Sequence, residues 1–129
     1  MIEFYFPTSG GEWAAFTAAA ITALIGLAAL VAPRAILASL GLAPVADRPG
    51  AVAEGRSRLA GFPLAIGLCA LLFAQPLIYL ALGAGWAFSA FGRLVSVVVD
   101  RGNPGFNLIC AAVEAALAAG PLLYGLGMI

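Results

Sequence analysis

Residues 13–31, WAAFTAAAITALIGLAALV, carry no charged side chain and are long enough to cross the hydrocarbon core of a bilayer as one helix. Three further apolar runs follow, so the expected spans are residues 13–32, 58–75, 77–99 and 106–127. Pro63 lies near the start of the second run, where proline is tolerated because the first amides of a helix lack partners within it. The sequence predicts an all-α integral membrane protein, an antiparallel four-helix bundle forming a single domain over residues 1–129.

The composition of the whole chain agrees with a membrane protein. Hydrophobic residues make up 64% of the 129 residues and charged residues 9%, against roughly 45–50% and 25% in soluble domains. The chain contains no histidine and no lysine, which excludes imidazole bases, histidine metal ligands and lysine Schiff bases. Two cysteines alone cannot form a zinc site. We therefore assign no catalytic, cofactor-binding or metal-binding residue, and a bound lipid is the only ligand considered.

The arginines fall on one side of the predicted spans. The first connection carries Arg34, Arg48, Arg56 and Arg58, and the third carries Arg101. Because arginine-rich connections stay in the cytoplasm, the sequence predicts a bacterial inner-membrane protein with both termini in the periplasm. The zero net charge gives no indication of nucleic-acid binding.

Three aromatic residues agree with this orientation. Trp13, Tyr79 and Tyr124 all lie toward the periplasmic ends of their predicted spans. Amphipathic rings are favoured at the membrane–water interface. We therefore expect these three side chains near the outer interface.

The first connection allows two interpretations after Pro33. Ile36, Leu37 and Leu40 fall on one helical face, which favours a short interfacial helix in this cytoplasmic connection. Alternatively, the first helix continues and bends at the proline. Residues 43–55 contain two prolines and two glycines, which are typical of a loop.

Glu114 lies near the middle of the fourth predicted span, where a carboxylate is costly unless it is paired or protonated. Arg93, in the third span, lies at a matching depth when the chain is folded back at Asn103. The sequence therefore predicts an intramembrane pair between Arg93 and Glu114. Two alternatives stay open, a snorkelling Arg93 and a Glu114 that couples transport to protons or binds a ligand.

Small residues predict close helix packing. Gly61 with Gly67, and Gly83 with Gly85, lie at or near the spacing that lets helix backbones approach in lipid. Gly92, next to Arg93, is expected to leave room for a neighbouring helix.

Five charged residues are expected together at the cytoplasmic face. They are Glu54, Arg56, Arg58, Asp100 and Arg101. One interpretation is a set of salt bridges that join the start of the second span to the turn between the third and fourth. The other is a solvated rim whose arginines set the topology or contact anionic headgroups.

The order of these features resembles a family of small four-helix bacterial inner-membrane proteins known as a domain of unknown function. The matching residues are Glu54, Arg56, Arg58, Gly61, Gly67, Gly92-Arg93-Leu94, Ser96, Asp100, Gly102 and Glu114. The family pattern has an Asp-Gly turn, which Arg101 interrupts here. The resemblance spans nearly the whole chain and implies the four-helix membrane fold but no activity.

Three functions are compatible with these features. The first is a non-enzymatic accessory, assembly or stabilising subunit that packs beside a larger inner-membrane complex or self-associates as a homo-oligomer. The second is a small oligomeric transporter that uses Glu114. Small multidrug transporters carry their membrane-embedded glutamate in the first helix, however, and the first span here has no charge. The third is a lipid- or isoprenoid-binding protein with Glu114, Arg93, Tyr79 and Ser96 around a cavity.

Overall fold

The computed structural model describes residues 3–46, 48, 50–101 and 103–129, and within these residues it contains helices and no strand. Four helical stretches are long and apolar enough to span a membrane, which confirms the predicted all-α class and number of spans. They are α1 (Gly10–Val31); α3 (Gly50–Glu54), η1 (Gly55–Leu59) and α4 (Ala60–Phe73) in succession; α5 (Pro76–Val99); and α6 (Pro104–Gly125).

Side-chain caps and prolines set the beginnings of the helices. The hydroxyl of Ser9 accepts a hydrogen bond from the backbone N–H of Glu12 at 3.2 Å, and Asn103 caps α6 in the same way through Phe106 at 3.2 Å. Both α5 and α6 begin with a proline, whose missing N–H costs nothing in the first turn. The observed limits of α1, α5 and α6 lie close to the predicted ones.

The second span begins earlier than predicted, at Gly50 instead of residue 58. Residues 50–55, which the sequence analysis assigned to a loop, form α3 and the first residue of η1. Glu54 and Arg58, one helical turn apart, form a salt bridge of 3.3 Å on the outer surface of this stretch. These charged side chains therefore lie on the surface of a helix that has already begun, and they do not indicate where it starts.

Five residues of π-helix precede α4, and Pro63 explains them. In a regular helix the N–H of residue 63 would bond to the carbonyl of Leu59, but proline has no N–H and its ring clashes with that carbonyl. The π-helical segment Gly55–Leu59 ends at that residue. The widened turn lets the second span continue through a proline that would otherwise break it.

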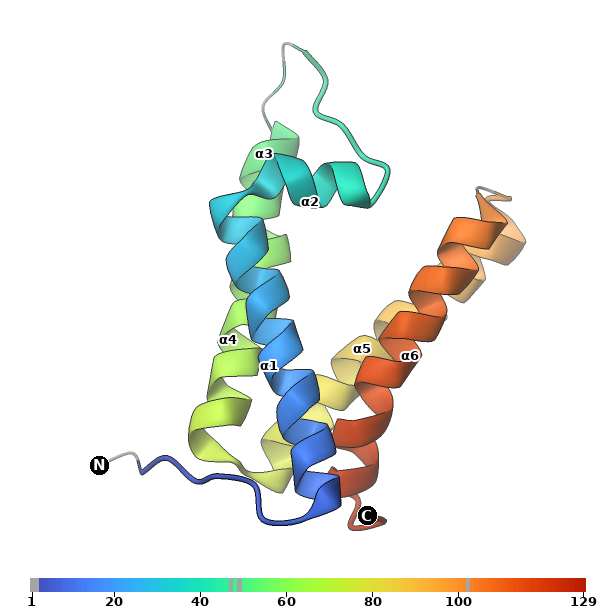
Figure 1. The fold of residues 1–129 in the computed structure, drawn as a ribbon. Helices are drawn as coiled ribbons and strands as arrows, with labels where there is room; N and C mark the ends of the chain where they lie inside the picture. Colours follow the sequence, from blue (N-terminus) through green and yellow to red (C-terminus); the bar gives the residue numbers. More distant parts are fainter. Residues whose placement is uncertain (1–2, 47, 49, 102) are drawn as a thin grey trace.

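A separate short helix, α2 (Pro33–Ser39), follows α1. Ala32 leaves the helical conformation at φ −132° and ψ 63°, and Figure 1 shows α2 turning sharply away from the axis of α1. Leu37 is buried and packs near Gly55 at the beginning of η1. The structure therefore has a short separate helix here instead of a bent continuation of α1, and the place of this helix at the membrane interface stays a prediction.

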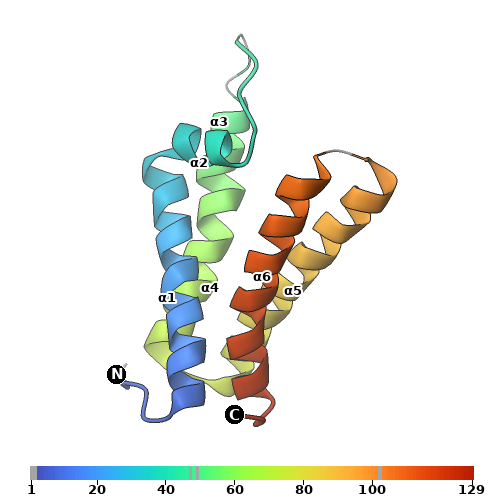
Figure 2. The same cartoon turned by 45° about the vertical axis from the view of Figure 1, so that its right-hand side comes forward.

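The four long helices form two pairs that meet at one end and diverge at the other. α1 lies beside α4, and α5 lies beside α6, in both views (Figures 1 and 2). Both termini lie at the end where the pairs meet, and α2 and α3 lie at the opposite end of the first pair (Figure 1). The helices therefore form a wedge instead of packing along their full length as a closed bundle.

Glycines mark the places where helix backbones touch. A Cβ at Gly67 in α4 would lie 2.7 Å from the backbone nitrogen of Ala23 in α1, and one at Gly120 in α6 would lie 3.0 Å from the carbonyl oxygen of Ala14. Close helix packing was correctly predicted for Gly67 and Gly83. Three other glycines of the predicted small-residue pattern face open space, namely Gly61, Gly85 and Gly92.

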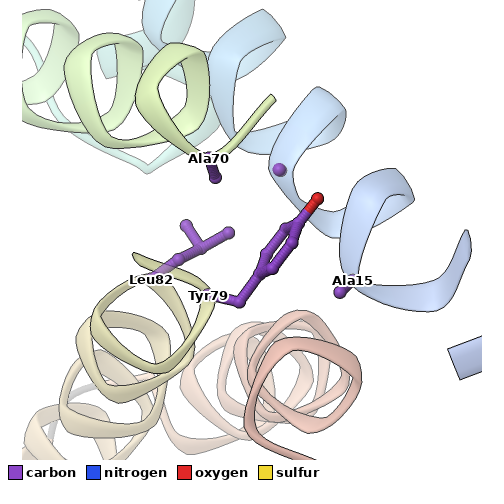
Figure 3. Close-up of a cluster of buried hydrophobic side chains, with 5 residues drawn as sticks. Ala15, Ala70, Tyr79 and Leu82 are labelled. Carbon is purple, nitrogen blue, oxygen red and sulfur yellow. The ribbon is translucent and has the colours of Figure 1, made fainter. Parts of the chain in front are cut away.

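Tyr79 is the central side chain of the core where the pairs meet. Figure 3 shows its ring between Ala15 of α1, Ala70 of α4 and Leu82 of α5. Its ring also lies edge-on to that of Tyr124, with the centroids 5.4 Å apart. Tyr79 is only 1% exposed, so it packs in the protein core, and its position at the outer membrane interface stays a prediction.

Substituting Gly67 with alanine is expected to destabilise the protein by about 1–3 kcal/mol, because the added methyl group meets helix backbone that cannot rotate away. Thermal unfolding in detergent measures the effect. Gly61→Ala on the same helix is the matched control, since a Cβ there meets nothing within 4 Å, and it is expected to be neutral or slightly stabilising. Equal losses for the two variants would contradict the α1–α4 contact.

Candidate functional site

Arg93 on α5 and Glu114 on α6 form an ion pair across the second helix pair. The Nε of Arg93 donates to Oε1 of Glu114 at 2.7 Å. The Nη1 of the same guanidinium donates to Oδ1 of Asn107 at 3.2 Å. Asn107 and Glu114 are seven residues apart and share one face of α6, so the planar guanidinium binds two turns of that helix at once.

The short connection between α5 and α6 explains this register. Asn103 caps α6 only three residues after Asp100, which caps the end of α5. Two helices joined so closely lie side by side, and positions equally far from the turn face each other. The structure thus brings together the two residues that the sequence analysis paired, and it adds Asn107, which that analysis did not identify.

The pair lies well inside the membrane-spanning stretch. Glu114 is the eleventh of the 22 residues of α6, and its side chain is 12% exposed, against 24% for that of Arg93. Charges at this depth are tolerated only when they are paired and hydrogen-bonded. Arg93 serves as the counter-ion of Glu114, so it is held within the protein instead of extending to the headgroups.

One oxygen of Glu114 lacks a partner. Oε2 is buried and accepts no hydrogen bond from any residue that the structure describes. An unpartnered buried carboxylate oxygen can accept a proton or a hydrogen bond from a small donor. This atom is the one part of the site with unused chemical capacity.

The five cytoplasmic-face charges do not form one cluster. Glu54 pairs with Arg58 on the first helix pair, whereas Asp100 accepts a hydrogen bond from Ser96 at 2.7 Å on the second. The predicted salt bridges between the start of the second span and the turn after α5 are absent among the described residues. The two pairs diverge toward this end (Figure 1), so the charges are held apart. Arg101 adopts a left-handed conformation at φ 49°, and Gly102 of the family pattern lies outside the described residues.

Arg56 has a role that its position in sequence did not indicate. Its Nη1 donates to the carbonyl oxygen of Leu30 at 2.9 Å. The last carbonyls of a helix have no partner within it, and a nearby arginine satisfies them. Arg56 therefore binds η1 to the last turn of α1, directly before that helix ends at Ala32.

A hydrogen bond and a cavity lie between the two helix pairs. The indole Nε1 of Trp86 on α5 donates to Oγ1 of Thr22 on α1 at 2.8 Å, and Thr22 donates to the carbonyl of Ala18 at 2.7 Å. Beside this bond is a cavity of about 350 Å³. The lining residues are Thr22, Phe62, Pro63, Ile66, Ala81, Leu82, Gly85, Trp86 and Ser89.

The cavity differs from the one that the lipid-binding hypothesis assumed. None of the four residues proposed for it, Arg93, Glu114, Tyr79 and Ser96, lines the cavity. Arg93 and Glu114 point to each other, and Tyr79 fills the core. The only sequence indication of the actual cavity was a glycine and a serine, Gly85 and Ser89, one turn apart on an otherwise bulky helix face.

Comparison of the chain with family models, with curated proteins and with solved structures found no match. The resemblance to a small four-helix membrane family therefore stays a prediction. In the part of the chain that the structure describes, no three metal-ligating side chains gather, and Cys69 and Cys110 are free thiols.

Replacing one partner of the ion pair is expected to cost more than replacing both. Arg93→Met or Glu114→Leu alone leaves a buried charge without a counter-ion, at about 3–5 kcal/mol. The double variant removes both charges and is expected to be closer to wild type than either single variant. Thermal unfolding of the four proteins in detergent gives the coupling energy. Additive losses would mean that the two side chains do not interact in the membrane protein.

Proposed function

We propose that this chain is a non-catalytic, multi-pass protein of the bacterial inner membrane. It serves as an accessory, assembly or stabilising subunit, packing beside a larger membrane complex or against further copies of itself. The four apolar helices place it in a membrane as a multi-pass protein; the membrane, the partner and the role are the proposal.

The observation that carries the proposal is the way Arg93 is used. Its guanidinium binds Glu114 and Asn107 together, so the two charged groups deepest in the spans hold α5 against α6. A substrate or a transported ion would have to compete with this short, half-buried pair. The arrangement favours a structural role for both residues over a role in turnover.

The wedge shape supports association with other helices. The helices expose large apolar side chains, among them Phe62 on α4 and Phe88 and Phe91 on α5. Small residues that meet nothing, such as Gly61 and Gly92, lie on the same helices. Open faces of this composition suit the close approach of a partner helix in lipid.

Gentle purification in native-lipid particles is expected to recover the chain in a stoichiometric membrane complex or a defined homo-oligomer. Deleting the chain is expected to lower the amount of that complex, measured by quantitative membrane proteomics. The matched control is a strain carrying Glu114→Leu together with Arg93→Met, which keeps the helices and is expected to restore the complex. Substrate uptake or turnover by the isolated protein in vesicles would overturn the proposal.

Both termini are proposed to face the periplasm. Arg34 and Arg48 lie in the connection at the end opposite the termini, and Arg56 and Arg58 lie in η1 near the same end, which the positive-inside rule assigns to the cytoplasm. A phosphatase fused after Ile129 is therefore expected to be active. A fluorescent protein fused at the same position, and carried to the periplasm by the general export route, is expected to stay dark. An inactive phosphatase beside a fluorescent fusion would reverse the orientation.

One observation favours a second candidate function, a small oligomeric transporter. Oε2 of Glu114 is buried without a hydrogen bond and could take up a proton. In that case Glu114→Gln would abolish substrate export while the protein still folds, because the amide keeps the shape of the side chain and loses its titration. A subunit with a structural pair would show reduced stability with Glu114→Gln and no transport in either form.

A further inference from the structure

The cavity between the helix pairs has the size of a ligand site. Its volume of about 350 Å³ lies within the roughly 300–1,000 Å³ typical of pockets that bind small molecules. Helices α1, α4 and α5 contribute its walls, and it is partly open to the outside. The ion pair does not account for the cavity, since neither Arg93 nor Glu114 lines it.

The chemistry of the walls suits a hydrocarbon chain. Most lining residues are apolar, and the two polar groups at the base already satisfy each other, since Trp86 donates to Thr22 and Thr22 donates to Ala18. An occupant therefore needs no hydrogen-bonding group of its own there. Ser89 is the one remaining polar side chain in the lining, and a serine hydroxyl in a helix can bond back to its own backbone.

The depth of the cavity points to the same occupant. Thr22 is the thirteenth of the 22 residues of α1, and Phe62 the thirteenth of the 24 residues of the second span. The cavity thus lies near the midpoint of the helices, in the hydrocarbon region, where water is absent. An apolar space that opens there is filled by lipid chains.

Arginines flank the cavity on the side of α2 and α3. Arg58 precedes Phe62 by four residues, so it lies on the same helix face about 6 Å nearer that end. Arg93 follows Ser89 by the same spacing on α5, but its guanidinium is held by Glu114. Arg58 pairs only with Glu54 at 3.3 Å, and the side chains are 74% and 59% exposed. Such exposed pairs contribute little, so Arg58 is free to bind a phosphate instead.

We propose that the cavity holds the end of one acyl chain of an anionic phospholipid whose phosphate is bound by Arg58. The end of the chain lies beside Trp86 and Gly85 on α5, opposite Phe62 and Ile66 on α4. The headgroup stays at the membrane surface on the arginine-rich side, within reach of the long Arg58 side chain. The bound lipid fills the wedge and holds the two helix pairs at their observed separation.

Gly85 offers a direct test. It lines the cavity, and a Cβ there meets no protein atom within 4 Å, so Gly85→Leu is expected to place its side chain in the cavity. Gly92→Leu on the same helix is the matched control, since Gly92 also faces open space but does not line the cavity. Ser89→Leu blocks the cavity from the next turn and serves as a second blocking variant if Gly85→Leu does not fold.

Quenching of Trp86 fluorescence by brominated lipid reports occupancy. In a Trp13→Phe background Trp86 is the only tryptophan, because the chain has two. Delipidated protein in detergent is titrated with phosphatidylglycerol or phosphatidylcholine that carries bromine near the end of one acyl chain. We expect quenching that saturates at one phosphatidylglycerol per chain and an affinity about fivefold higher than for phosphatidylcholine.

The variants separate the two parts of the proposal. Gly85→Leu is expected to lose the saturable quenching, and Gly92→Leu is expected to keep it. Arg58→Gln is expected to bind phosphatidylglycerol and phosphatidylcholine with about equal affinity. Quenching that never saturates, or that is equal in Gly85→Leu and Gly92→Leu, would overturn the acyl-chain site. Equal binding of both lipids by the wild-type chain would overturn the headgroup assignment. A co-purifying protein that must be removed before lipid quenches Trp86 would assign the cavity to a partner helix instead.

Discussion

The close contact of helix backbones at one end of the molecule determines the arrangement of everything else. In lipid, hydrophobic burial gives little drive for helices to associate, so packing and hydrogen bonding must hold them. Here α1 is the common element, because it touches α4 through Gly67 and α6 through Gly120. Tyr79 fills the space that remains between the helices, with its ring against alanines of α1 and α4 (Figure 3). The two pairs are fixed at this end, and their divergence elsewhere follows.

The charged side chains form bonds within each helix pair, and they do not hold the two pairs together at the open end of the wedge. Removing the Arg93 and Glu114 charges from water is costly, and the direct hydrogen bond with the added contact to Asn107 offsets that cost. Both partners lie within α5 and α6, so this interaction stiffens one pair without joining it to the other. The charges of the first pair likewise bond within it, as Arg56 does with Leu30. Between the pairs, Trp86 donates a side-chain hydrogen bond to Thr22.

The sequence predicted local and sequentially neighbouring structure, and it failed where distant helices meet. The spans followed from apolar length, and the pairing of Arg93 with Glu114 followed from a connection too short to allow another register. The crossing of non-neighbouring helices had no such constraint. Gly83 and Gly85 look equivalent in sequence, yet the first packs against Leu122 and the second faces the cavity. The position of Tyr79 near a helix end did not indicate that its ring fills the core between three helices. Glu54 and Asp100 were grouped by their expected depth along the membrane spans, and this depth carries no information about the angle between the helix pairs.

The divergence of the helix pairs has a consequence for the membrane around them. The helices are gathered at the end that carries the termini and spread apart at the opposite end (Figures 1 and 2). Since each pair spans the bilayer, the protein has a narrow outline in one leaflet and a broad one in the other. A cone-shaped protein of this kind fits membrane that curves so that the leaflet around its broad end is expanded. In membrane that curves the other way, the same protein increases the bending stress. The energy of the protein in a membrane therefore depends on local curvature, and strongly curved membrane differs from flat membrane in how well it accommodates the protein.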